Sequence, residues 1–399
     1  MRVSWMNKKR LFTAAARILF AAVLILGLET WGWLHVDRPF DSFVPSWRFH
    51  HIRKPNSSQT ARSFFAFNPA MISRFPASAR WEFNEHGWLH DKGFPLRKAA
   101  DTYRIFYLGD SFTEGHTLPE DSMPAVVRRQ LASRFHNDGV RIEVINAGIV
   151  GFSPALYYIQ TRYKIMDFDP DLLVVNIDMT DDLEEWSYRE RMIGDEEGNP
   201  LALPFLWSYL ASEYDDAAGV FRATWATRAI LLLHSRSYFF NYLLYIRAVS
   251  EDAGGEANQV PETALYERWA WCREEWDERT EQTVSAMFEM IERLVIYCRG
   301  RGVKVMLTGV PHYRQYHADK EGLEPPDQSD RPHRELEKLA ANLGVPYLNS
   351  HQTLKSHIEG RRQSMHYFDG DIHFNAEGNR LWGREQASFL VDPANGLLP

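Results

Sequence analysis

Ser111 follows a short apolar stretch and stands at a position suited to a nucleophile. Residues 103–108 are mostly aromatic or branched and are bounded by Gly109, a pattern typical of a buried strand. Residues 121–131 then carry a capping side chain, an early proline and an apolar face, which predict a helix. A serine between a parallel strand and a helix lies where open α/β sheets bind ligands. Ser111 is therefore a candidate nucleophile, and a turn without chemistry is the competing interpretation.

A serine nucleophile needs a base, and the base can come from a distant part of the chain. Residues 368–375, FDGDIHFN, place His373 among acidic residues, just before the last expected helix. Asn375 is suited to cap that helix. In such an arrangement the histidine takes the serine proton, and a carboxylate orients the histidine.

Two of these stretches resemble a known family. Residues 109–113, GDSFT, are similar to the first block of the SGNH (GDSL) hydrolases, and residues 371–373, DIH, are similar to their last block. The resemblance extends over about residues 84–392, with a long insertion. It implies acyl transfer through Ser111, with His373 as the base.

The resemblance also implies an acidic residue that orients His373. Most members of the family place this acid three residues before the histidine, where the present chain has Gly370. Asp371 is therefore the expected acid, and Asp369 is the second choice. No cofactor is implied, because this chemistry uses side chains alone.

The oxyanion site is expected to differ from that of the family. Gly151 matches the glycine of the second block, so the backbone amides of Ser111 and Gly151 are the expected donors. Relatives have Gly-x-Asn-Asp in the third block, where the asparagine amide is a further donor. In this chain Asp181 takes the place of that asparagine. An ionised carboxylate accepts hydrogen bonds and donates none, which weakens the expectation of efficient hydrolysis.

Strands and helices alternate along the rest of the chain. Further strands are expected at 141–146, 171–178, 303–309 and 345–349, and helices are expected from 153, over 262–299, over 333–343 and after residue 375. This order predicts a three-layer α/β/α fold with a parallel, flavodoxin-like sheet. Residues 184–262 are expected to form a helical insertion.

The N-terminal region is apolar and follows a basic tail. Residues 11–36 predict a transmembrane signal-anchor, interrupted by Arg17 and Glu29 near its two ends. A cleaved signal peptide is the competing interpretation, because 18–28 also fits an h-region. The anchor would make the protein a single-pass membrane protein with a periplasmic hydrolase domain over 101–399. Residues 37–100 would form an extracytoplasmic lead-in.

Composition excludes several classes of function. The net charge of −8 leaves no basic patch for nucleic acid, and the aromatic content of 14% indicates a folded core. Cys272 and Cys298 are the only cysteines. They lie too far apart in sequence for a zinc site, and no other metal-ligand spacing is present. Whether the two cysteines pair is left open by the sequence.

Three functions fit these features. The first is an esterase that removes acyl groups, acetyl foremost, from a glycan or lipid of the cell envelope. The second is an O-acyltransferase that uses the same serine on an exopolysaccharide, together with partners of envelope biosynthesis. The third, suggested by Asp181, is a glycan-binding remnant without catalysis.

Overall fold

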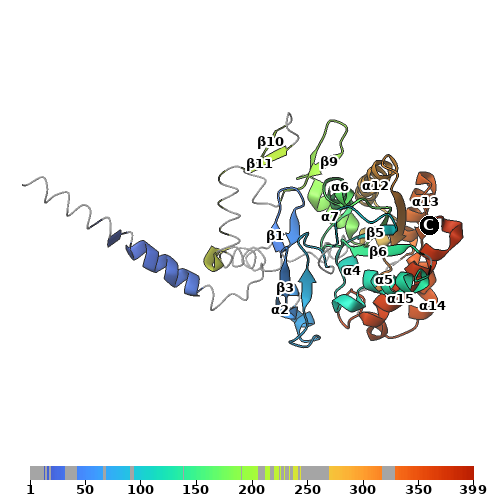
Figure 1. Ribbon diagram of the computed structural model, residues 1–399, viewed down its shortest axis with the longest axis horizontal. Helices are drawn as coiled ribbons and strands as arrows, with labels where there is room; N and C mark the ends of the chain where they lie inside the picture. The colour runs from blue at the N-terminus through green and yellow to red at the C-terminus, as the bar shows by residue number, and fades with distance from the viewer. Residues whose placement is uncertain are drawn as a thin grey trace, which may run out of the picture.

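The computed structural model describes most of the chain from residue 43 onward. The described residues are 19–31, 43–65, 69–89, 94–137, 139–189, 191–204, 269–316 and 329–399, with a few short stretches within 13–17 and 212–243. Figure 1 shows them as a coloured ribbon.

A five-stranded parallel sheet forms the centre of the molecule. Its strands lie in the order β13-β12-β7-β5-β6, and every neighbouring pair is parallel. The strands are β5 (Thr102–Leu108), β6 (Arg141–Asn146), β7 (Leu172–Ile177), β12 (Lys304–Gly309) and β13 (Tyr347–Leu348). This is the flavodoxin-like order, so the predicted fold class is confirmed. Each strand was expected from its apolar run, to within two residues at either end.

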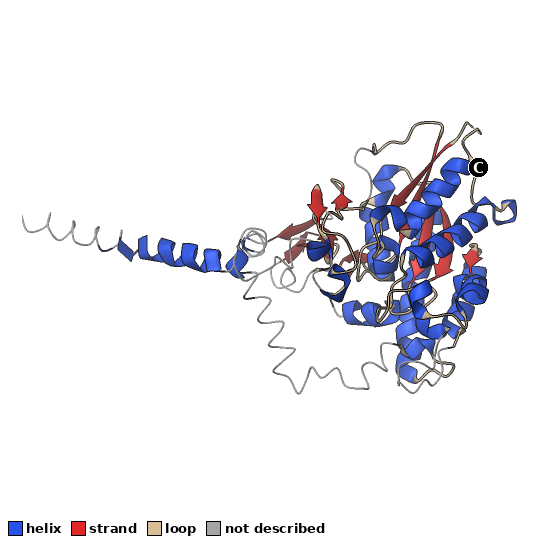
Figure 2. Cartoon of the chain, turned by 90° about the horizontal axis from the view of Figure 1, so that it is seen from below, coloured by secondary structure: helices blue, strands red, loops and turns tan. Residues whose placement is uncertain are grey.

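Helices cover both faces of the sheet. One face carries α6 (Pro154–Tyr163), α12 (Glu278–Arg299) and α13 (Arg331–Leu343), and the other carries α5 (Met123–Arg134), α14 (Ser350–Ile358) and α15 (Ala376–Val391). Figure 1 shows the first set above β5 and the second set below it, and Figure 2 shows helices on both sides of the strands. Along β5 the side chains alternate between the two cores, because successive strand residues point to opposite faces. Phe106 and Leu108 face one core, and Ile105 and Tyr107 face the other.

The switch in strand order sets the place of the site. β5 has β6 on one side and β7 on the other, so the connections leaving β5 and β7 diverge at the carboxyl edge of the sheet. Ligands of open α/β sheets bind at such a switch point. The short helix α4 (Ser111–Glu114) begins at this edge, directly after β5.

Residues 43–89 form a small lobe, called here the N-terminal lobe. Its elements are β1 (Phe43–Pro45), β2 (His51–Arg53), β3 (Ser57–Gln59), α2 (Ala61–Phe64), α3 (Pro69–Ile72) and β4 (Trp81–Phe83). The pairs β1-β2 and β3-β4 are antiparallel. The lobe has its own apolar core around Phe64, Phe65 and Trp81. The lead-in is therefore folded structure, although its predicted boundaries at 37 and 100 stay predictions.

The insertion contains short strands as well as helix where it is described. After α7 (Asp181–Arg189) come four short strands, which are β8 (Ile193–Gly194), β9 (Pro200–Ala202), β10 (Ser212–Asp215) and β11 (Val220–Ala223). They pair as two antiparallel ribbons. In the first ribbon the Asp195 carboxylate accepts the Asn199 amide at 2.7 Å, a local bond that favours a turn over a helix. Farther along the insertion, helix is assigned at residues 225, 229, 233, 238–240 and 243, and most of the other residues up to 262 lie outside the described part of the chain.

The long helix expected over 262–299 begins later, at Glu278. The Asp277 carboxylate caps it by accepting the Thr280 amide at 2.8 Å. Residues 262–268 lie outside the described part of the chain.

The membrane-spanning helix expected within 11–36 is contradicted by the structure. Among all the helices in the described ranges, none combines the length and apolar character that crossing a membrane requires. The predicted single-pass membrane localisation is therefore wrong.

Candidate active site

The turn after β5 is built so that Ser111 starts a helix. A side chain on Gly109 would place its Cβ 2.0 Å from Thr113 Oγ1, so only glycine fits the close approach of this helical turn. The Asp110 carboxylate caps α4 by accepting the Phe112 amide at 2.9 Å. Ser111 is then held at the carboxyl edge of the sheet with 7% of its surface exposed.

Ser111, His373 and Asp371 lie in one hydrogen-bonded line. Ser111 Oγ is 2.8 Å from His373 Nε2, and His373 Nδ1 is 2.6 Å from Asp371 Oδ1. Because a carboxylate can only accept, the network assigns the ring proton to Nδ1, which leaves Nε2 to accept the serine proton. Asp371 Oδ1 also accepts the His373 backbone amide at 2.9 Å. Asp371, rather than Asp369, is the acid that contacts the histidine.

Asp371 remains ionised in this setting. Burial alone raises the pKa of its carboxyl group, but the hydrogen bonds from His373 and the charge on that ring outweigh burial, and they hold the pKa of Asp371 well below its usual range. An ionised Asp371 can stabilise a positively charged His373.

The loop that carries His373 is fixed at both ends. The Phe368 amide donates to the His373 carbonyl at 3.0 Å. Asn375 caps α15 by accepting the amides of Glu377 and Gly378 at 3.0 and 3.1 Å, as the sequence predicts. Arg74, from the N-terminal lobe, donates to the Asp369 carbonyl at 2.5 Å. These contacts limit the movement of the histidine toward or away from the serine.

Gly151 lies in a loop that runs beside the serine turn. The Ile149 amide donates to the Gly109 carbonyl at 3.0 Å, which places the loop against the end of β5. Gly151 has φ +70°, a conformation that favours glycine, and its carbonyl accepts the Tyr188 hydroxyl at 2.6 Å. Within the described contacts, the Gly151 amide donates to no protein acceptor. It is available as a donor.

Asp181 is held by a tyrosine hydroxyl and a backbone amide. Its carboxylate accepts the Tyr157 hydroxyl at 3.2 and 3.3 Å and the Asp178 amide at 3.1 Å, and the residue is fully buried. Asn176, on β7, donates to Thr113 Oγ1 at 2.8 Å. The structure therefore brings Ser111, His373 and Asp371 together, and it holds the Asp181 carboxylate against Tyr157 and the Asp178 amide.

A buried carboxyl pair beside the serine was missed by the sequence analysis. Asp110 Oδ2 lies 3.1 Å from Ser111 Oγ. Burial, and then the charge of Asp178, raise the pKa of Asp110 well above its usual range, and burial raises the pKa of Asp178 despite bonds from Thr180. Both shifts favour a neutral form. The signal in the sequence was Asp178 itself, an acidic residue directly after an apolar strand.

A second histidine also borders the site. The ring of His116 lies 3.8 Å from that of His373, centroid to centroid, and the Phe112 ring lies 4.8 Å from it. His116 and His373 are more than 250 positions apart in the chain, so the sequence does not reveal their contact. The only signal in the sequence was that His116 lies close to Ser111.

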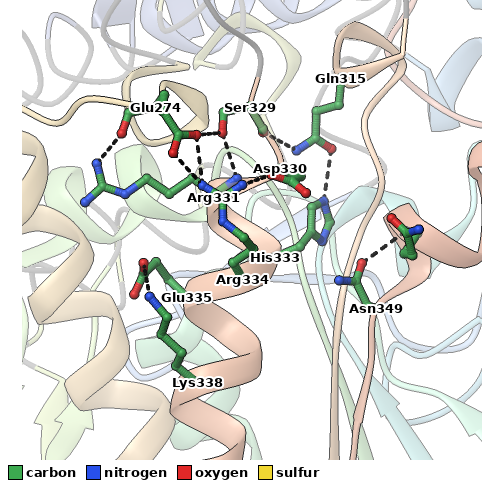
Figure 3. A network of polar contacts seen from close by, with 11 residues as sticks. Glu274, Gln315, Ser329, Asp330, Arg331, His333, Arg334, Glu335, Lys338 and Asn349 are labelled. Atoms are coloured by element: carbon green, nitrogen blue, oxygen red, sulfur yellow. Dashed lines mark hydrogen bonds and ion pairs between the residues drawn. The ribbon is translucent and has the colours of Figure 1, made fainter.

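The polar loop after β12 is buried next to the site, where the His312 ring lies 6.2 Å from that of Phe112. His312 is buried against Trp269, with ring centroids 4.2 Å apart. Gln315 ties this loop to α13, because its Oε1 accepts the His312 amide at 2.9 Å and lies 3.1 Å from His333 Nε2. Figure 3 shows the contact between Gln315 and His333 and its continuation through Ser329 to Glu274. His317, in the same loop, lies outside the described residues.

No metal site is found in the described part of the chain. Its histidine, cysteine and carboxylate side chains form no cluster able to hold a metal ion. Cys272 and Cys298 are both buried and are not joined by a disulfide.

Comparison with known proteins identifies the family. No curated protein matches the chain. Similar solved structures include an acetylxylan esterase from Geobacillus stearothermophilus (11% identity, 73% of this chain and 94% of that one, TM-score 0.42). Others are an α/β hydrolase from the metagenome of Lake Arreo, Spain (12%, 74% and 96%, 0.39), and a two-domain esterase active on acetylated mannans (12%, 72% and 48%, 0.37). These similarities are too low to assign a function to the chain.

The family model is decisive, because it matches more than half of the chain. The GDSL-like lipase/acylhydrolase family matches residues 107–381, a range that includes the serine turn after β5 and the loop before α15. The chain therefore belongs to the GDSL-like lipase/acylhydrolase family and is a hydrolase of ester bonds.

Proposed function

We propose that this chain is a serine esterase that removes short acyl groups, acetyl foremost, from hydroxyl groups of a glycan. One observation carries the proposal: Ser111 Oγ, the His373 ring and Asp371 Oδ1 form a continuous line with contacts of 2.8 and 2.6 Å. The envelope setting is left out of the proposal, because it depended on the predicted membrane helix.

In the first half of the reaction His373 acts as a base. Its Nε2 takes the proton of Ser111 as Oγ attacks the carbonyl carbon of the ester. Asp371 holds the ring in position and stabilises the imidazolium that forms. His373 then returns the proton to the departing sugar hydroxyl, which leaves the acyl group on Ser111. In the second half a water molecule gives its proton to His373 and releases the acid.

Negative charge develops on the ester oxygen in both halves. The backbone amides of Ser111 and Gly151 are the proposed donors to that oxygen. The raised pKa of Asp110 supports a neutral carboxyl group next to the nucleophile. A neutral carboxyl group at this position does not repel the oxyanion.

The closeness of the side chains around Ser111 supports a short acyl group. The nucleophile is 7% exposed, and His373 is 9% exposed. The rings of Phe112 and His116 lie directly against His373. A long acyl chain would have to displace these packed rings, and such repacking is costly in a close-packed interior.

The proposal is tested by measuring the acid released from two substrates: acetate from acetylated oligosaccharides and fatty acid from a phospholipid. We expect the wild type to act on the oligosaccharides and Ser111→Ala to lose activity by at least about 10³-fold. Ser133, exposed on α5, provides the control, and Ser133→Ala should keep full activity. Release from the phospholipid alone would overturn the glycan assignment, and full activity of Ser111→Ala would overturn the role of the serine.

A further inference from the structure

His116 packs directly on the histidine of the proposed site. The two ring centroids are 3.8 Å apart, with an angle of 38° between the planes. This is closer than the 4.8 Å between Phe112 and His373. Of these two rings, that of His116 is nearer to His373. No step of the proposed ester hydrolysis uses His116.

The N-terminal lobe holds His116 in place. The rings of Phe64 and Phe65 meet it edge to face, with centroids 6.0 and 5.4 Å away. The following residue, Thr117, is fixed as well: its carbonyl accepts Trp81 Nε1–H at 2.8 Å. Aromatic contacts of this geometry are favourable and directional. The orientation of His116 is therefore set by a lobe that precedes the catalytic domain in sequence.

A buried ion pair anchors the same segment. Arg53 of the lobe donates from Nε and Nη2 to the two carboxylate oxygens of Glu114, each at 2.6 Å. The Arg53 and Glu114 side chains are 1% and 0% exposed. A bidentate pair of this kind fixes direction as well as distance. Residues 114–117 are thus attached to the lobe on both sides of His116.

His116 is suited to remain uncharged. Its Nδ1 is buried and has no hydrogen-bond partner among the described residues, so a proton there would be left unsatisfied. Burial lowers the pKa of His116 well below its usual value; the charges of His373 and Arg53 lower it further, while Asp371 acts in the opposite direction. A neutral ring can face the imidazolium of His373 without charge repulsion.

We propose that His116 is a positioning residue for His373: a neutral ring, fixed by the N-terminal lobe, that keeps the catalytic imidazole aligned with both Ser111 and Asp371. The proposal rests on the proposed function, in which His373 is the general base. In this role His116 does not contact the substrate. It limits rotation of the His373 ring, which must stay within hydrogen-bonding distance of both partners at once.

The variants His116→Phe and His116→Ala separate positioning from other roles. Phenylalanine keeps a flat, uncharged ring, whereas alanine removes it. For hydrolysis of p-nitrophenyl acetate by the full chain, we expect His116→Ala to lower kcat by about 10²-fold, the typical cost of a small misplacement of a catalytic group. KM should change little, and His116→Phe should restore most of kcat. An increase of KM in both variants with kcat unchanged would show substrate contact and overturn the proposal.

A measurement without substrate makes the test independent of the proposed function. The Nδ1 proton shared by His373 and Asp371 should give a resolved downfield proton NMR signal in the wild type and in His116→Phe. In His116→Ala that signal should broaden or disappear, while the fold, monitored by circular dichroism, stays the same. A sharp signal in all three proteins would overturn positioning by His116. Failure of the proposed function would instead appear as an inactive wild type with this signal intact.

Discussion

At the scale of single residues, the structure distinguishes between the two carboxylates, Asp371 and Asp369, that could orient His373. Asp371 Oδ1 lies 2.6 Å from His373 Nδ1, while the Asp369 carbonyl is bound by Arg74. We predict that Asp371→Asn lowers kcat of ester hydrolysis by about 10⁴-fold, because the amide no longer fixes the ring tautomer. Asp369→Asn is the matched control and should stay within about threefold of the wild type. Steady-state kinetics on p-nitrophenyl acetate check both, and the reverse order of effects would contradict the assignment.

Asp181 leads to a prediction that differs from the one its sequence position suggests. A carboxylate in the oxyanion site would make Asp181→Asn more active. The structure instead bonds this carboxylate to the Tyr157 hydroxyl and the Asp178 amide, and an asparagine oxygen can accept both bonds. We therefore expect Asp181→Asn to leave kcat of ester hydrolysis within about threefold of the wild type. A rise of about 10²-fold or more, the usual value of an oxyanion donor, would contradict this placement.

The residues of the site differ in how far the sequence could reveal them. Ser111 and His373 stand in short patterns whose local turns can be derived from neighbouring residues. The spacing of the acid could not decide between Asp371 and Asp369, because the backbone path through Gly370 determines which carboxylate faces the ring. His116 and Asp178 gain their roles from packing between distant segments, which no local pattern encodes.

At the scale of elements, the start of α6 depends on a side chain from another helix. Ser153 precedes α6 without capping it, and Glu185 of α7 accepts both the Ser153 hydroxyl at 2.8 Å and the Ala155 amide at 3.0 Å. Burial raises the pKa of Glu185 to about 7, despite these bonds. Between its unfolded and folded pKa values, Glu185 is therefore mostly protonated in the folded protein and mostly ionised in the unfolded chain.

This gives a prediction for the pH dependence of stability. The folded pKa of Glu185 is about 7, and its unfolded value is about 4.3. The stabilising contribution of the protonated form is thus fully present below about pH 4.3 and is lost as the pH rises through 7. We expect the wild type to lose on the order of 3 kcal/mol relative to Glu185→Gln between about pH 5 and pH 8. Urea unfolding at several pH values checks this, and parallel curves for the two proteins would contradict it.

Elements were more predictable than their connections. The five strands of the sheet are apolar runs bounded by turn residues, so their identity is local information. The late start of α12 at Glu278 follows from the Asp277 cap, which an apolar period of helical spacing does not reveal. The ribbons β8-β9 and β10-β11 are only two to four residues per strand, too short to show an alternating pattern.

At the scale of the whole molecule, the N-terminal lobe and the catalytic domain are joined by the Arg53–Glu114 pair. Both side chains are buried, and Glu114 lies three residues after the nucleophile. Breaking a buried pair leaves one charge without a partner, which typically costs about 3–5 kcal/mol. We predict this loss in the free energy of unfolding for Arg53→Met. Adding Glu114→Leu should recover much of it, because no buried charge then remains. Urea denaturation of both variants checks the prediction, and equal stability of the single and double variants would contradict it.

The central claim, that Ser111 is the nucleophile activated by His373, is tested most directly by covalent labelling. A fluorophosphonate reacts with a serine only where a base activates it. After incubation with the full chain, peptide mass spectrometry should find the phosphonyl adduct on Ser111. His373→Ala should lose the label although Ser111 is still present, and Ser133→Ala should retain it. An adduct on another serine, or equal labelling of Ser111 in the wild type and His373→Ala, would contradict the account.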